Sequence, residues 1–201
     1  MDPATLGWLV SMVLAVSSII FSVLYVKSVR PAHRERRVGE CAYRQCGRLR
    51  MWSMIVMTAA MACFVLYRWF PLPIDPLPAK LPWPYPLSAA VAVLVGVPAM
   101  TLILLGMRDA GTEAIAPDRA SEMYGGIYER IRHPQILGEA PIWLVVALLL
   151  DSPSLALLSL VYLVVWYWWA VEEERDLLLR FGQAYADYRE RTGMLMPRRR
   201  V

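Results

Sequence analysis

Three long apolar stretches with almost no charge constrain this chain most. Residues 6–26 and 86–107 contain no charged side chain, and residues 51–70 contain only Arg68, near the end of the stretch. A helix needs about 20 apolar residues to cross the hydrocarbon core of a bilayer. A long basic side chain near the end of a span can reach the membrane surface. The pattern therefore predicts three membrane-spanning helices within residues 1–107.

Two shorter apolar stretches follow, at residues 136–150 and 155–171. Asp151, Ser152 and Pro153 separate them, and residues of these types favour a tight turn. We expect a helical hairpin over residues 136–171. A polar helix over residues 172–191 should follow it. The predicted fold is thus all-α: a membrane bundle of five transmembrane helices with a C-terminal, cytoplasmic amphipathic helix.

The connections between the apolar stretches alternate in positive charge. Residues 27–50 contain eight Lys or Arg, residues 71–85 contain only Lys80, residues 108–133 contain four Arg, and the chain after residue 171 contains seven. Cytoplasmic connections of membrane proteins are enriched in Lys and Arg. The alternation therefore predicts an N-terminus outside and a C-terminus in the cytoplasm, and the compact form suggests a prokaryotic inner membrane.

The overall composition agrees with a membrane protein. Hydrophobic residues make up 58% of the 201 residues, more than the half that is usual for soluble domains. The net charge of +4 sits in the connections, so membrane orientation explains it better than nucleic-acid binding. The length suits a single unit, residues 1–201, and residues 6–26 are interpreted as a retained anchor rather than a cleaved signal peptide.

The three cysteines do not predict a metal site. Cys41 and Cys46 are too far apart for a CxxC pair, and no histidine cluster lies beside them or Cys63. Free thiols in a reducing compartment are the simpler interpretation. We expect no metal.

The first group of candidate functional residues lies in residues 124–139, YGGIYERIRHPQILGE. Pro134 can open the fourth apolar helix at its first turn, and the free N–H groups of a helix N-terminus favour an anion. Glu139 then lies about one turn inside an apolar helix, where an ionisable group is costly and is a functional candidate. Arg132 and His133, taken alone, could be ordinary basic residues of an inner membrane face.

Residues 172–188, EEERDLLLRFGQAYADY, carry the second group. Leu177, Leu178, Phe181, Tyr185 and Tyr188 recur at helical spacing and predict an apolar face that can fold back on the membrane surface. The acidic run at 172–174 repels itself unless a cation meets it. A solvated helix start, favoured by the helix dipole, is the alternative for this run.

Together the two groups resemble the isoprenylcysteine carboxyl methyltransferase family, within the membrane methyltransferases that include phospholipid N-methyltransferases. The matching residues, in chain order around the hairpin, are Tyr128, Arg132, His133, Pro134, Gly138, Glu173, Glu174, Phe181, Gly182, Tyr185, Tyr188 and Pro197. The match covers about residues 124–197. Residues 1–107, the three N-terminal spans, agree only in being membrane helices.

The resemblance implies a cytoplasmic pocket for S-adenosylmethionine, which leaves as S-adenosylhomocysteine. Its cofactor-binding residues here would be Tyr128, Arg132, His133, Pro134, Gly138, Glu173 and Glu174, and its catalytic residues would be Arg132, His133 and Glu139. The methyl acceptor would be a lipid or isoprenoid that enters sideways from the bilayer. We expect methyl transfer to such an acceptor at the inner membrane face, with the bilayer and this acceptor as the partners.

Two departures from the family pattern bear on the acceptor. Ile136 stands where the family has a tyrosine, and residues 167–171 contain no arginine suited to a substrate carboxylate. An amine or hydroxyl acceptor would instead need a proton acceptor, for which Glu139 or His133 is available. Two other functions stay open: a catalytically inactive scaffold of the same fold, and an NADPH-dependent membrane reductase.

Overall fold

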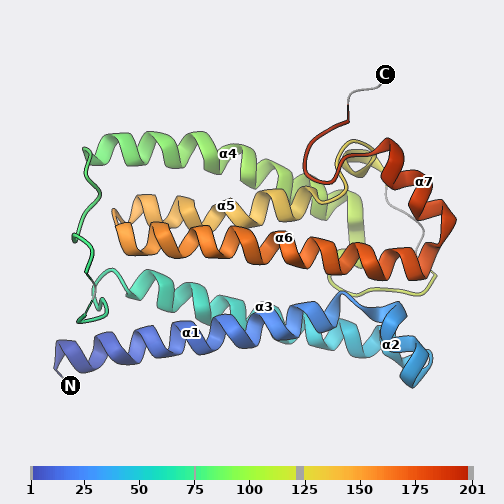
Figure 1. The fold of residues 1–201 in the computed structure, drawn as a ribbon, viewed down its shortest axis with the longest axis horizontal. Coiled ribbons are helices and arrows are strands. Elements are labelled where there is room, and N and C mark those ends of the chain that lie inside the picture. Colours follow the sequence, from blue (N-terminus) through green and yellow to red (C-terminus); the bar gives the residue numbers. More distant parts are fainter. Residues whose placement is uncertain (1, 75, 121–124, 199–201) are drawn as a thin grey trace.

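The structure is a computed structural model that describes residues 2–74, 76–120 and 125–198. Every regular element in these ranges is a helix, apart from an isolated bridge between Ile131 and Gly193. The elements are α1 (Pro3–Ser28), α2 (Pro31–Val38), α3 (Cys41–Leu66), α4 (Tyr85–Ala110), η1 (Gly111–Ala114), η2 (Gly126–Glu129), α5 (Pro134–Leu149), α6 (Pro153–Phe181) and α7 (Gln183–Arg191). The predicted all-α class is confirmed (Figure 1).

Four helices are long and apolar enough to cross a membrane: α1, α3, α4 and α6. Three of them contain the three predicted N-terminal spans, although α3 begins ten residues before the predicted stretch and ends at Leu66. The helix α5 is apolar but has only 16 residues. A fifth span therefore stays a prediction, whereas the multi-pass character of the chain is supported.

The ends of α6 follow from local sequence chemistry. Ser152 caps its start, because the Ser152 hydroxyl accepts a hydrogen bond from the backbone N–H of Leu155 at 3.4 Å. Its end lies at Gly182, whose φ of +57° favours glycine. The polar helix expected at residues 172–191 is consequently divided: its first part continues α6, and its second part is α7.

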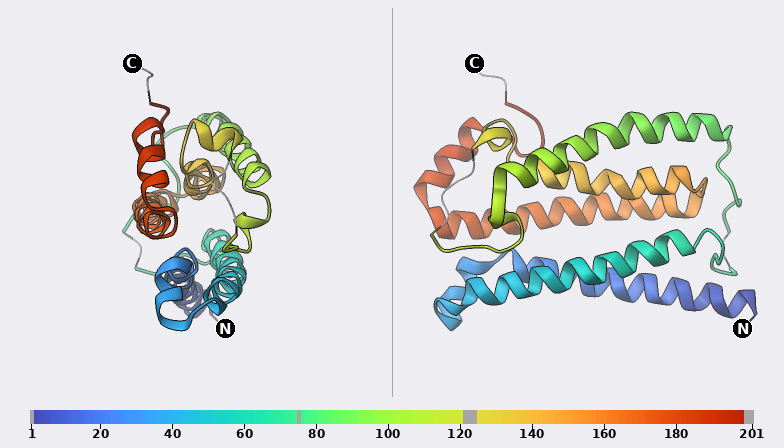
Figure 2. Two further views of the ribbon diagram at one scale, coloured as in Figure 1. Left: turned by 90° about the vertical axis from the view of Figure 1, so that its right-hand side faces the viewer. Right: turned by 180° about the vertical axis from the view of Figure 1, so that it is seen from behind.

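The helices lie in two groups along a common direction (Figures 1 and 2). The first group pairs α1 with α3, and the second contains α4, α5 and α6. Two glycines allow close approach of α4 and α5: a Cβ at Gly138 would lie 2.5 Å from the Ala99 carbonyl oxygen, and one at Gly106 would lie 2.6 Å from Gln135 Cγ. The two groups meet at an aromatic core made of Phe21, Phe64, Trp143, Tyr162, Trp166 and Trp169.

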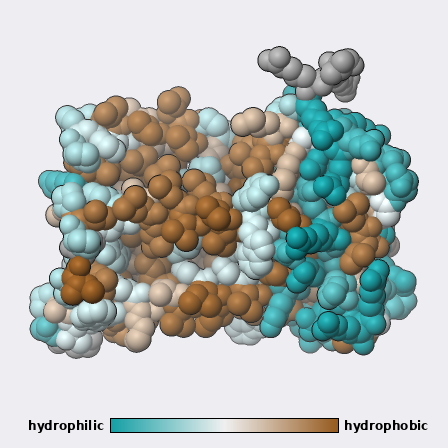
Figure 3. Space-filling view, in the orientation of Figure 1, coloured by the Kyte–Doolittle hydropathy of each residue, from teal (hydrophilic) through white to brown (hydrophobic). Residues whose placement is uncertain are grey.

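The surface divides by polarity along the helix direction. Hydrophilic residues gather at the end of the molecule where α2 and α7 lie, and apolar residues cover much of the remaining length (Figure 3). Large apolar side chains such as Leu94 and Val164 are about 70% exposed, at 74% and 68%. An apolar surface of this kind faces lipid rather than water. The basic connections, at residues 27–50, 108–120 and 125–133, lie at the hydrophilic end.

Candidate active site

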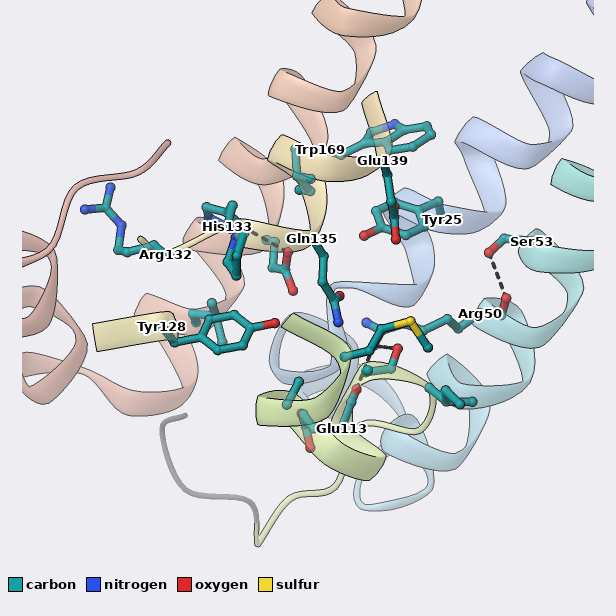
Figure 4. Close-up of a pocket in the computed structure, with 18 of the residues that line it drawn as sticks. Tyr25, Arg50, Ser53, Glu113, Tyr128, Arg132, His133, Gln135, Glu139 and Trp169 are labelled. Carbon is teal, nitrogen blue, oxygen red and sulfur yellow. Dashed lines mark hydrogen bonds and ion pairs between the residues drawn. The ribbon is translucent and has the colours of Figure 1, made fainter. Parts of the chain in front are cut away.

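A cavity of about 160 Å³ lies inside the hydrophilic end of the bundle (Figure 4). Residues from α1, α3, α4, η1, η2, α5, α6 and α7 contribute to its wall. Its polar and aromatic lining residues are Phe21, Tyr25, Arg50, Ser53, Glu113, Tyr128, Arg132, His133, Gln135, Glu139, Trp169, Glu173, Phe181, Tyr185 and Tyr188. The cavity therefore collects titratable groups from both halves of the chain.

The Arg132-His133-Pro134 corner is fixed by the segment that follows α7. The backbone N–H of Arg132 donates to the carbonyl of Gly193 at 2.9 Å, and that of His133 donates to the carbonyl of Met194 at 3.1 Å. Pro134 then opens α5 at its first position, where its missing N–H costs nothing. The corner thus has a defined position although it lies between helices.

Glu174 links this corner to α6 and α7. Its Oε1 lies 2.7 Å from Arg132 Nε and 3.3 Å from His133 Nε2, and its Oε2 lies 3.3 Å from Arg189 Nε. The side chains of Arg132 and Glu174 are each only 8% exposed. Arg132 also donates through Nη1 to the carbonyls of Arg189 and Thr192. In Figure 4 the Arg132 guanidinium points away from the centre of the cavity.

His133 lies between Glu173 and Glu174 of α6. Its Nδ1 is 3.5 Å from Glu173 Oε2, and its Nε2 faces Glu174. Burial alone would lower the pKa of His133, but the hydrogen bonds and negative charges of Glu173 and Glu174 outweigh burial, so the pKa lies above the ordinary histidine value. The site therefore favours a protonated imidazole more than water does.

Three tyrosines, Tyr128 of η2 and Tyr185 and Tyr188 of α7, line the cavity. Tyr128 donates its hydroxyl to the carbonyl of Gly106 at 3.2 Å, and Tyr188 donates to the carbonyl of Tyr128 at 2.6 Å. Burial raises the pKa of Tyr188 to about 12 and raises that of Tyr185 as well. These phenols consequently remain protonated donors at neutral pH. The Tyr185 hydroxyl is buried and has no hydrogen-bond partner within the described part of the chain.

The structure brings most of the sequence-predicted site residues to this one cavity. Tyr128, Arg132, His133, Pro134, Glu139 and Glu173 all line it. Glu139 accepts a long hydrogen bond from Trp166 Nε1 at 3.4 Å. Two predicted residues do not line the cavity: Gly138 packs against α4, and Glu174 lies behind the corner that it holds. Ile136, at the position of the family's tyrosine, is buried and lines the wall.

Sequence reasoning missed the contributions of the N-terminal half. Arg50 reaches the cavity from α3, and its Nη1 donates to the carbonyls of Glu113 and Ala114 at 2.9 and 3.1 Å. Tyr25 comes from α1 and stacks on Trp169 with 4.5 Å between ring centroids. One signal for Arg50 was available in the sequence, its position immediately before an apolar stretch. Basic residues are common at such positions, so this signal does not distinguish a site residue.

A second buried ion pair secures the wall next to Arg50. Arg180 Nη1 lies 2.7 Å from Glu113 Oε1, and both side chains are less than 10% exposed, at 7% and 6%. The Glu113 carboxylate also accepts from the backbone N–H of Asp118 at 2.8 Å. This pair holds the turn after α4 against the end of α6. Over the described ranges, no group of three or more His, Cys, Asp or Glu is placed to hold a metal ion.

Comparison with known proteins bears directly on this geometry. The family model for phospholipid methyltransferases matches residues 87–184, from α4 into the start of α7. Over these residues the chain is similar to the phospholipid methyltransferases. The resemblance predicted from the sequence is thereby confirmed, and its span includes the corner, the hairpin and the paired glutamates.

A curated relative extends this methyltransferase relationship. Methanethiol S-methyltransferase 2 of Bradyrhizobium diazoefficiens is 35% identical over 102 residues, which are 47% of this chain and 37% of the relative. The chain thus spans well under two thirds of that relative's length. No solved structure matches the chain.

Proposed function

We propose that this protein transfers a methyl group from S-adenosylmethionine to a lipid acceptor at the inner face of a membrane. The observation that carries the proposal is a convergence: the Arg132-His133-Pro134 corner and Glu173 reach the same cavity, although the α5–α6 hairpin separates them in the chain. The methyltransferase match over residues 87–184 supports the same reaction class.

The chemistry of the cavity wall fits such a cofactor. Trp169 Nε1 and the Tyr185 hydroxyl are buried donors for which the described residues supply no acceptor, so a bound nucleoside could satisfy them. The Glu173 carboxylate suits the cofactor's ammonium group. The ring of Tyr25 suits its sulfonium, because a cation over an aromatic face gains about 0.5–2 kcal/mol.

The roles of the remaining residues follow from their places. Tyr128, His133 and Pro134 line the cofactor side, whereas Arg132 and Glu174 hold the corner in position. Gly138 lets α5 approach α4 closely enough to form the wall. The bound cofactor supplies an electrophilic methyl group, and the protein contributes mainly by aligning the acceptor with it and excluding water.

The acceptor would enter from the bilayer. Met54 of α3 and Met107 of α4 both line the cavity, and they are 43% and 45% exposed on the apolar surface. We take the space beside these two exposed methionines as the way in for the acceptor. Methionine side chains adapt to differently shaped apolar ligands. An apolar chain is thus the acceptor type that this opening fits.

Cofactor binding is the first test. Purified protein in detergent should bind S-adenosylhomocysteine, measured by calorimetry, and Glu173→Gln should weaken this binding about tenfold or more because it removes the charge facing the ammonium. Glu190→Gln, on the exposed surface of α7, is the matched control and should bind normally. Binding of NADPH in place of S-adenosylhomocysteine would point to a reductase, and binding of neither would point to a scaffold.

Acceptor identity is the second test. Membranes that contain the protein should transfer label from S-adenosylmethionine to a component of a total lipid extract. A small thiol is the second candidate acceptor, because the curated relative is named a methanethiol S-methyltransferase. Label in a volatile thioether, and none in lipid, would show that the acceptor is a thiol and not a lipid.

A further inference from the structure

We propose that Arg50 and Gln135 form a subsite for the α-carboxylate of the cofactor, and this inference rests on the proposed function. Arg50 lies outside the family motif, and Gln135 stands within it at a position for which the motif specifies no residue type. They come from α3 and from the first turn of α5, and both line the cavity. The subsite would complete the site from the N-terminal half of the chain.

Both side chains present donors that the protein leaves unused. Arg50 Nε and Gln135 Nε2 are buried, and neither has a hydrogen-bond partner in the described ranges. The Arg50 guanidinium is held by the carbonyls of Glu113 and Ala114, so its position is fixed before any ligand binds. In Figure 4 the Gln135 side chain points toward Arg50 from another wall of the cavity.

Two buried donors that face one another indicate the position of an acceptor atom. Buried N–H groups in folded proteins are nearly always paired, so two N–H groups without acceptors at the wall of one cavity mark a place for a ligand oxygen. One of the two donors belongs to a cation that is always protonated. An anionic oxygen therefore suits this place better than a neutral carbonyl.

The charges of the other lining residues assign this anion to the cofactor. Arg132 is the other arginine of the wall, but Glu174 neutralises it and its guanidinium points away from the cavity. Glu173 offers a carboxylate to an ammonium group. An amino acid carries its ammonium and carboxylate on the same carbon atom, so a cavity that binds the first needs a cation close by for the second. Arg50 supplies that cation.

A pair of nucleosides tests this subsite. S-adenosylhomocysteine contains the carboxylate, whereas 5′-methylthioadenosine shares its adenosine and sulfur but lacks the amino-acid end. Arg50→Gln should raise the dissociation constant of S-adenosylhomocysteine by about tenfold or more, and that of methylthioadenosine by less than about twofold. Gln135→Leu should give a smaller loss in the same direction, since it removes a neutral donor.

Arg48→Gln is the matched control, because Arg48 lies on the same helix but is exposed and outside the cavity. It should leave both dissociation constants unchanged. Equal weakening of both nucleosides by Arg50→Gln would overturn the subsite and make Arg50 a structural residue. Unchanged binding of both would overturn it as well. A wild-type protein that binds neither nucleoside would instead contradict the proposed function.

Discussion

Glu174 is the residue on which the corner of the site depends. Its two carboxylate oxygens pair with Arg132 and His133, from the segment before α5, and with Arg189 of α7. Loss of one partner from a buried ion pair is commonly destabilising by about 3–5 kcal/mol, because the other charge stays buried. Glu173, one residue earlier, keeps its side chain at the cavity. Adjacent glutamates thus have different surroundings: Glu174 holds the corner, and Glu173 faces the cavity.

The first prediction concerns Glu139 as proton acceptor. Glu139→Gln should lower kcat by about 100-fold or more, because general bases contribute about 10²- to 10⁴-fold, and it should change S-adenosylhomocysteine affinity less than about twofold. Single-turnover methylation and calorimetry measure the two quantities. The hydrogen bond from Trp166 Nε1 can persist in this variant, since the Gln oxygen also accepts. Equal loss of rate and affinity, or loss of neither, would remove Glu139 from the mechanism.

The second prediction concerns the pH dependence of stability. The pKa of His133 is higher in the folded state than its ordinary value near 6.5, because Glu173 and Glu174 face it. Its contribution to stability is therefore complete below about pH 6.5 and is lost as the pH rises through the folded-state pKa. Thermal unfolding in detergent between pH 6 and pH 9 should show this loss in the wild-type protein, and a smaller one in His133→Gln.

His33→Gln is the control for that measurement, since His33 lies on the exposed side of α2. It should show the wild-type dependence on pH. A His133→Gln profile parallel to that of the wild-type protein would mean that the imidazole charge does not stabilise the corner.

At the scale of elements, residues 150–153 show what local sequence can predict, and Gly182 shows what it cannot. Asp151 and Ser152 lie between α5 and α6, and Pro153 begins α6, where the local chemistry of these residues predicts a turn. The division between α6 and α7 was missed, since Leu177, Phe181 and Tyr185 keep helical spacing across Gly182 and periodicity does not register a change of direction. These three residues face the cavity and not the membrane surface that was expected for them.

The short helix α2 could not be predicted from its own residues. Its sequence, PAHRERRV, has no apolar face, and a helix of eight residues is marginal in isolation. Asp176 of α6 stabilises its start by accepting from the backbone N–H groups of Ala32 at 2.9 Å and His33 at 2.7 Å. A carboxylate at a helix N-terminus also stabilises the helix, because its negative charge interacts favourably with the helix dipole. The element therefore depends on a contact with a distant part of the chain.

The third prediction concerns the contact between α4 and α5. Gly138→Ala should destabilise the protein by about 1–3 kcal/mol, because the new Cβ would lie 2.5 Å from the Ala99 carbonyl oxygen, and backbone cannot move aside cheaply. Gly47→Ala in α3 is the control, since its nearest neighbour lies at 3.8 Å. Chemical unfolding in detergent measures both. A neutral Gly138→Ala variant with weakened S-adenosylhomocysteine binding would instead assign Gly138 to the cofactor.

At the scale of the whole molecule, the aromatic run at residues 166–169 shows where sequence was insufficient. An interfacial belt is the simple interpretation of four aromatic residues near the end of a span. Tyr167 and Trp168 fit it, at 51% and 48% exposed, but Trp166 and Trp169 are each 1% exposed. Trp169 packs edge-to-face on Phe21 at 4.9 Å. That contact joins α1 to α6, and no local pattern specifies which helices become neighbours.

The fourth prediction tests the orientation that the alternating basic connections imply. In a variant without Cys41, Cys46 and Cys63, Lys80→Cys should react with a membrane-impermeant maleimide on intact spheroplasts, whereas Arg36→Cys should react only after permeabilisation. Both positions are exposed in the structure, so a difference between them reports the side of the membrane and not burial. The reverse pattern would place the cavity outside, where S-adenosylmethionine made in the cytoplasm could not reach it. Reaction at both positions in intact spheroplasts would contradict the predicted spans between them.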